Sequence, residues 1–156
     1  MQFSEETKKY WEDKDWNDLE KAKSVADLYI IAKRIISRIP KPFVQVCGPI
    51  GTGGLGSIEA NLKLFNKAIK KLQNQGINVF DQMPFEKPMQ KLHDKSVAKG
   101  KYPENILTDF YCPLFESGLI STFYFLFKTP GFSSFSMGVE GANLILEPRV
   151  KILSNS

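Results

Sequence analysis

A glycine-rich turn after the first predicted strand has a composition typical of phosphate-binding turns. Residues 43–47 (FVQVC) form an apolar run that predicts a buried strand, and residues 57–76 carry apolar side chains mostly at helical spacing. Glycine lacks a Cβ, so backbone N–H groups can lie close to a ligand, and the N-terminus of the next helix favours an anion. We expect a ligand's phosphate or sugar to be bound by Gly48, Pro49, Gly53, Gly54, Gly56 and Ser57.

The stretch from Gly51 to Gly56 also matches the dinucleotide-binding pattern G-x-G-x-x-G. A strand is predicted at residues 77–81, which places Asp81 at its carboxyl end. The turn before the pattern is longer than the tight turn of a dinucleotide site, and Asp81 lies beyond the usual spacing of about 20 residues. A dinucleotide site and a wide turn without a ligand therefore stay open as alternatives to a sugar or phosphate site to which Asp81 contributes.

A second loop, at residues 129–136, follows the most apolar stretch of the chain, residues 119–127, which predicts a central strand. Because the carboxyl ends of parallel strands share one edge of the sheet, this loop and the glycine-rich turn are expected to face one cleft. Glu140 lies about one turn inside a helix predicted at residues 137–146, so its carboxylate could reach that cleft. A serine cap followed by an ordinary glutamate is the alternative. Ser134 and Ser136 are expected to bind a phosphate, and Gly131 is expected to contribute to substrate binding.

Apolar periodicity, interrupted by proline and glycine, predicts the remaining elements. Helices are expected at residues 4–14, 17–38, 86–98 and 106–118, and a last strand at residues 150–153. A helix between successive strands implies a parallel crossover. The sequence therefore predicts a helical extension at residues 1–40 and an α/β domain at residues 41–156. That domain has a parallel sheet of four or five strands with helices on both faces.

Both loops resemble segments of the nucleoside deoxyribosyltransferase-like superfamily, and more closely of its small bacterial and phage members. The matching residues are Gly48, Pro49, Pro130, Gly131, Ser134, Ser136 and Glu140. The resemblance extends over residues 43–153 and implies a flavodoxin-like three-layer sandwich, often homodimeric, without a cofactor. It implies cleavage or transfer at the N-glycosidic bond of a deoxynucleoside or its monophosphate, with Glu140 as nucleophile and Ser134 at the 5′-phosphate. A carboxylate suits this reaction because its transition state resembles an oxocarbenium ion.

The chain departs from that family at three positions, one of which is Ser136, where the pattern has a glycine. Gln45 stands where the transferases have a tyrosine, and Ser121 stands where an acidic residue assists protonation of the base. Asp81 or Glu116 could replace this acid. A binding module without catalysis, which keeps the pocket and has lost its helper residues, is therefore a second hypothesis. A third is an interaction protein whose N-terminal helices form a dimer interface.

Composition places the chain among globular proteins. Of its 156 residues, 42% are hydrophobic and 24% charged, and the net charge of +4 is too small to indicate nucleic-acid binding. Two cysteines and a lone His93 predict neither a disulfide framework nor a metal site. The charged N-terminal segment is unlike a secretory signal, and no apolar run would span a bilayer, so a cytoplasmic protein is expected.

Lysines recur every four residues along the helix predicted at residues 86–98. They would gather on one side of the helix and be solvated, or they would attract a nucleotide. The set begins at the second residue of this helix and continues beyond its end, comprising Lys87, Lys91, Lys95, Lys99 and Lys101.

Overall fold

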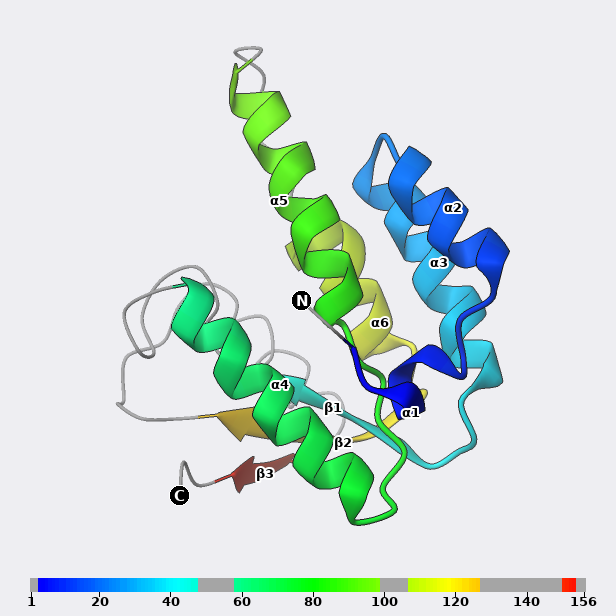
Figure 1. Cartoon of the computed structure of the whole chain (residues 1–156), viewed down its shortest axis with the longest axis vertical. Coiled ribbons are helices and arrows are strands. Elements are labelled where there is room, and N and C mark those ends of the chain that lie inside the picture. Colours follow the sequence, from blue (N-terminus) through cyan, green and yellow to red (C-terminus); the bar gives the residue numbers. More distant parts are fainter. Residues whose placement is uncertain (1–2, 48–57, 99–106, 127–149, 154–156) are drawn as a thin grey trace.

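The computed structural model describes residues 3–47, 58–98, 107–126 and 150–153 (Figure 1). Its helices are α1 (Glu5–Lys8), α2 (Asp13–Lys21), α3 (Val25–Arg38), α4 (Ile58–Asn74), α5 (Met83–Ala98), the π-helical turn η1 (Leu107–Tyr111) and α6 (Cys112–Glu116). Its strands are β1 (Phe43–Cys47), β2 (Ile120–Leu126) and β3 (Val150–Leu153). The strands at residues 43–47 and 150–153 are confirmed, and the strand predicted at 119–127 is confirmed over Ile120–Leu126.

The described strands form a small parallel sheet in the order β1-β2-β3. On the other edge of β1, the strand expected at residues 77–81 is reduced to a single parallel bridge between Val44 and Val79. Two backbone hydrogen bonds fix this bridge, from Val44 N–H to Asn78 and from Phe80 N–H to Val44, each 2.9 Å long. The segment stops pairing there because the next residues turn to begin α5.

The prediction of a flavodoxin-like three-layer sandwich with four or five parallel strands is wrong. The part of the chain that the structure describes is mostly helical, with six α-helices and only this small sheet. Much of the apolar surface that a wider sheet would cover is instead buried where the helices α2, α3 and α5 pack against one another. The class itself, mixed α and β with parallel strands, does hold.

The N-terminal helices begin and end at other residues than the periodicity indicated. The helices expected at 4–14 and 17–38 are instead α1, α2 and α3. Ser24 begins α3, because its side chain accepts a hydrogen bond from Asp27 N–H while the Asp27 carboxylate accepts one from Lys23 N–H. This reciprocal cap separates α2 from α3 where the apolar pattern alone is continuous.

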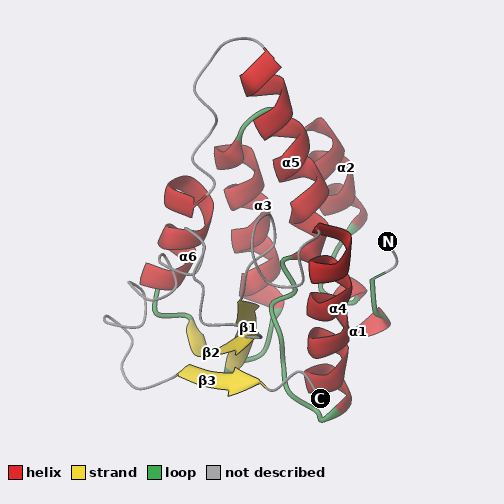
Figure 2. Ribbon diagram, turned by 90° about the vertical axis from the view of Figure 1, so that its left-hand side faces the viewer, coloured by secondary structure: helices red, strands yellow, loops and turns green. Residues whose placement is uncertain are grey.

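Helices cover both faces of the sheet (Figure 2). On one face Val44 and Val46 pack with α4, whose buried residues include Phe65 and Ile69. On the other face Phe43 and Cys47 share a larger core with α3, α5, η1 and α6. These two sets alternate along β1, as expected for a strand that is buried on both faces.

Stacked and tilted aromatic rings connect the N-terminal helices to the sheet. Trp11 stacks on Trp16 with ring centroids 4.2 Å apart, and it meets Phe85 of α5 at 5.3 Å. From Phe85 the contacts continue through Phe110, Tyr111 and Phe115 to Phe123 of β2, each at 5.0–5.8 Å. Trp11 therefore packs on the body of the chain, and Trp16 of α2 is joined to it by stacking on Trp11.

Candidate functional site

A group of buried and half-buried polar side chains lies where β1 ends and α5 begins. After β1 the chain passes through α4 to the bridge on one edge of β1, and then through α5, η1 and α6 to β2 on the other edge. Successive connections that leave a parallel strand toward opposite edges open a crevice at its carboxyl end, where ligands of α/β sheets commonly bind. We call the polar group at this place the β1-end cluster; it comprises Gln45, Cys47, Asp81, Gln82, Glu86 and Tyr111.

Asp81, which the sequence placed at the end of a strand, is buried and fully engaged. One carboxylate oxygen accepts the hydroxyl of Thr7 at 2.8 Å, and the other accepts Met83 N–H at 2.9 Å. Burial raises the pKa of Asp81, and both hydrogen bonds oppose that rise. The residue therefore joins α1 to the first turn of α5. Through that turn it positions Glu86.

Glu86 and Tyr111 form the centre of the cluster. The Tyr111 hydroxyl donates to a Glu86 carboxylate oxygen at 2.6 Å. Burial is the main cause that raises the pKa of Glu86 from 4.5 to about 7; the hydrogen bond from Tyr111 opposes it and the charge of Asp81 adds to it. Burial also raises the pKa of Tyr111, so the phenol keeps its proton. Glu86 is half-buried, so its carboxyl group can exchange a proton near neutral pH.

Two glutamine amides of the β1-end cluster, one on β1 and one just before α5, have unused hydrogen-bonding capacity. Gln45 on β1 is fully buried, and neither its amide oxygen nor its amide nitrogen has a partner among the described residues. Gln82 donates to the Val46 carbonyl at 2.6 Å, while its amide oxygen has no partner there. A buried amide without a partner costs about 1–3 kcal/mol, so such groups point to a bound water or ligand.

The Cys47 thiol contributes no reactive group. Burial raises its pKa far above the ordinary value, so it remains a protonated, weakly polar side chain. What the cluster offers chemically is an acid–base carboxyl group on α5, and unpaired amide atoms at Gln45 and Gln82.

Most sequence-predicted site residues lie outside the residues that the structure describes. This holds for both predicted loops and for the helix expected at residues 137–146. The residues concerned are Gly48, Pro49, Gly53, Gly54, Gly56, Ser57, Gly131, Ser134, Ser136 and Glu140. Their roles, and their meeting in one cleft, stay predictions.

The two acids considered as replacements for the missing helper differ in their surroundings. Asp81 is within the cluster, whereas Glu116 is exposed at the end of α6. Ser121 stands at the position where the transferases that the loops resemble carry an acid. Its hydroxyl donates to the Phe43 carbonyl at 2.9 Å and so links β2 to β1. Sequence reasoning missed Glu86. The available signal was a glutamate early in a helix that follows the carboxyl end of a predicted strand.

No protein-family model, curated protein or solved structure matches this chain. Within the described ranges no helix has both the length and the apolar character needed to cross a membrane. The same residues contain no group of three or more histidine, cysteine, aspartate or glutamate side chains suited to a metal ion.

Proposed function

We propose that the chain binds a nucleoside or nucleoside monophosphate at the β1-end cluster and cleaves or transfers at its N-glycosidic bond. The observation that carries this proposal is the Glu86–Tyr111 pair, a half-buried carboxyl group with a pKa of about 7 at the carboxyl end of a parallel strand. Departure of a base from a sugar is assisted by a proton. A carboxyl group that is partly protonated at neutral pH can supply it.

The amides of Gln45 and Gln82 support a base as the ligand. A glutamine side chain presents a donor and an acceptor side by side, which matches the donor–acceptor edges of nucleobases. Binding of a base would give the unpaired polar atoms partners and recover their desolvation cost. The resemblance of the loops adds Glu140 as the nucleophile and Ser134 as the phosphate contact, so Glu86 would take the role of the missing family acid.

A nucleotide-binding module without catalysis is the second candidate. It is favoured by Ser121, whose hydroxyl is engaged by the backbone of β1 at the position where the family carries its acid. The same amides would bind the base, and the ligand would remain intact. The two candidates therefore differ in base release and agree in ligand binding.

The test is base release from each deoxynucleoside and deoxynucleoside monophosphate, followed by chromatography. We expect Glu86→Gln to lower the rate by about 10²–10⁴-fold, the range for loss of a general acid. Glu140→Ala should abolish release. Glu116→Gln, which neutralises an exposed acid outside the cluster, is the matched control and should retain the wild-type rate.

The pH profile provides an independent check. Only the protonated carboxyl group donates a proton, so the rate should fall as the pH rises through about 7. The Tyr111 hydrogen bond lowers the pKa of Glu86, so Tyr111→Phe should move this decline to higher pH. Ligand-induced thermal stabilisation without base release would support the binding module. Neither stabilisation nor release with any nucleoside or nucleotide would contradict both candidates.

A further inference from the structure

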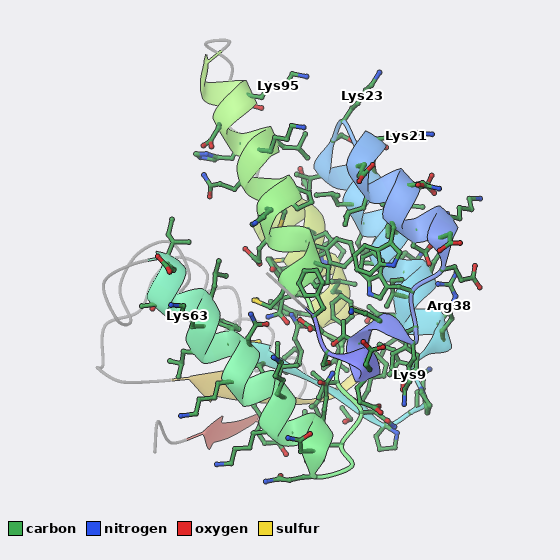
Figure 3. The ribbon with its side chains drawn as sticks, in the orientation of Figure 1. Lys9, Lys21, Lys23, Arg38, Lys63 and Lys95 are labelled. Carbon is green, nitrogen blue, oxygen red and sulfur yellow. The ribbon has the colours of Figure 1, made fainter. Side chains whose placement is uncertain are left out.

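A basic groove lies between the C-terminal end of α2 and the outer face of α5. Its volume is about 660 Å³. The two sides contribute five exposed lysines, namely Lys21, Lys23, Lys87, Lys91 and Lys95. Among the described residues that line it, Glu20 is the one acidic residue. Figure 3 shows Lys95 on α5 at the same end of the molecule as Lys21 and Lys23. We call this feature the lysine groove.

The lysines of the groove are not neutralised within the structure. Among the described residues none of them forms an ion pair, whereas Lys8 and Lys63 each pair with a glutamate on their own helix and Lys9, just after α1, pairs with Glu6. The acid Asp94 of α5 lies near His93 and accepts a hydrogen bond from Gln90, and none of these three residues lines the groove. Five like charges that face one hollow leave a positive potential there that an anionic ligand would relieve.

Between the lysines the groove is lined by apolar side chains. These are Leu19, Ala22, Pro88 and Leu92. A ligand that carries only phosphates would leave this surface uncovered. None of the described residues that line the groove is aromatic, so they offer no stacking surface of the kind on which single-stranded nucleic acids bind. The combination of charge and apolar floor fits a ligand that is itself both acidic and apolar.

The spacing of the lysines indicates which kind of acidic and apolar ligand fits the groove. Lys87, Lys91 and Lys95 follow one another at four-residue intervals on α5, so their Cα atoms lie about 6 Å apart along the helix axis. A helix with acidic residues at the same interval presents carboxylates about 6 Å apart as well, with an apolar stripe beside them. We propose that the lysine groove binds an acidic amphipathic helix of a partner protein. This proposal does not depend on the proposed function.

The experiment measures fluorescence anisotropy of a labelled amphipathic peptide of about four helical turns, with glutamates at four-residue intervals beside a leucine stripe. Salt is held at about 0.15 M, which screens weak long-range attraction. A peptide of the same composition in scrambled order tests whether the apolar floor matters. A single-stranded oligonucleotide and inorganic polyphosphate are the competing anions.

Charge reversal separates the groove from the general charge of the protein. The groove variant combines Lys87→Glu, Lys91→Glu and Lys95→Glu. The matched control combines Lys63→Glu, Lys67→Glu and Lys71→Glu, which have the same spacing on the exposed face of α4 and cause the same change in net charge. We expect the groove variant to weaken peptide binding by at least about tenfold and the control to leave it nearly unchanged. Lys91→Glu alone should weaken it in the same direction.

Four results would overturn the proposal. One is the absence of saturable binding of the amphipathic peptide to the wild-type protein. Another is equal binding of the scrambled peptide, which would indicate attraction by charge alone. Equal weakening by both triple variants would place the effect outside the groove. Tighter binding of the oligonucleotide or polyphosphate, with loss only in the groove variant, would assign the groove to a phosphate polymer.

Discussion

At the scale of single residues, Gln45 combines complete burial with an amide that has no partner in the described part of the chain. It lies on the face of β1 that also carries Phe43 and Cys47, within the larger core. An apolar residue of similar size would avoid the desolvation cost there. Retaining a glutamine in this core is therefore consistent with a binding role.

Gln45→Met should raise the free energy of unfolding by about 1 kcal/mol, because methionine fills a similar volume without buried polar atoms. The same variant should lose the thermal stabilisation that a nucleoside or nucleotide gives the wild-type protein. Urea denaturation measures the first effect and a thermal melt with ligand the second. A variant less stable than the wild type would mean that the amide has a partner in the free protein.

Glu86 should make the protein less stable as the pH rises. Its pKa is about 7 when folded and 4.5 ordinarily, so the folded state holds the proton longer than the unfolded state. Stability from this group is complete below pH 4.5, declines between 4.5 and about 7, and is lost above that range. Asp81, with its raised pKa, acts in the same direction.

In urea denaturation across this pH range, the free energy of unfolding should therefore fall with a slope as the pH rises. Glu86→Gln should make the total fall smaller by about 1–3 kcal/mol over the whole range. Glutamine keeps an oxygen for the Tyr111 hydroxyl and cannot titrate. An unchanged slope in the variant would show that other groups cause the pH dependence.

The sequence could not reveal this pair of residues. Glu86 lies in a segment interrupted by Pro84 and Pro88, and its partner Tyr111 is 25 positions away. Pairing and burial together produce the shifted pKa, and both depend on how η1 packs against α5. Asp81 was identified as a site residue from its position after a strand, although its partner in α1 was not foreseen.

At the scale of elements, Asp15 joins α2 to α3. Its carboxylate is fully buried and contacts two arginines of α3, Arg34 at 3.1 Å and Arg38 at 2.5 Å. It also accepts Glu12 N–H at 2.8 Å and so caps its own helix. A carboxylate shared by two guanidinium groups fixes how the helices pack, because removing it would leave Arg34 with Asp18 and Arg38 with Glu12 as their remaining, more exposed partners.

Asp15→Asn should lower the free energy of unfolding by about 3 kcal/mol, since a neutral amide at this buried position cannot balance the two half-buried guanidinium groups that contact it. Asp18→Asn is the matched control. Asp18 pairs with the same Arg34 at 2.7 Å on a more exposed side, so its loss should cost less than about 1 kcal/mol. Equal losses in the two variants would contradict the role assigned to Asp15.

Elements were predictable where the local pattern was unambiguous. The strands β1, β2 and β3 follow from short apolar runs, and the end of α4 follows from Gly76, which has a φ of +80°. The break between α2 and α3 was missed because it depends on the hydrogen bonds of Ser24 and Asp27. Burial of Asp15 was not visible either, since its partners lie in another helix.

At the scale of the molecule, the sequence predicted a sheet wider than the three described strands. An apolar run at residues 77–81 predicts a strand, but pairing along β1 ends after one bridge as Asp81 and Gln82 turn toward α5. Whether a run pairs over its length depends on the next element, and local periodicity does not report this. The aromatic contacts from Trp11 to Phe123 also join α2 and α5 into the core beside the sheet.

Both tryptophans of the chain, Trp11 and Trp16, lie in the first forty residues, so tryptophan fluorescence reports on that part alone. Because Trp11 packs on Phe85 of α5, we expect its unfolding to coincide with the loss of helical circular dichroism in urea. Global fitting of both signals is the measurement. Separate midpoints would instead support a helical extension at residues 1–40 that unfolds independently of residues 41–156.

The hydrogen bond from Thr7 to Asp81 has a practical consequence for anyone who shortens the protein. A chain trimmed to begin after α1 would lose this hydroxyl and expose a carboxylate whose other oxygen holds the first turn of α5. Such a truncation would disturb residues far along the sequence while leaving each of them chemically intact. Inactivity of a shortened protein would then reflect a displaced helix start and would carry no information about the chemistry of the full chain.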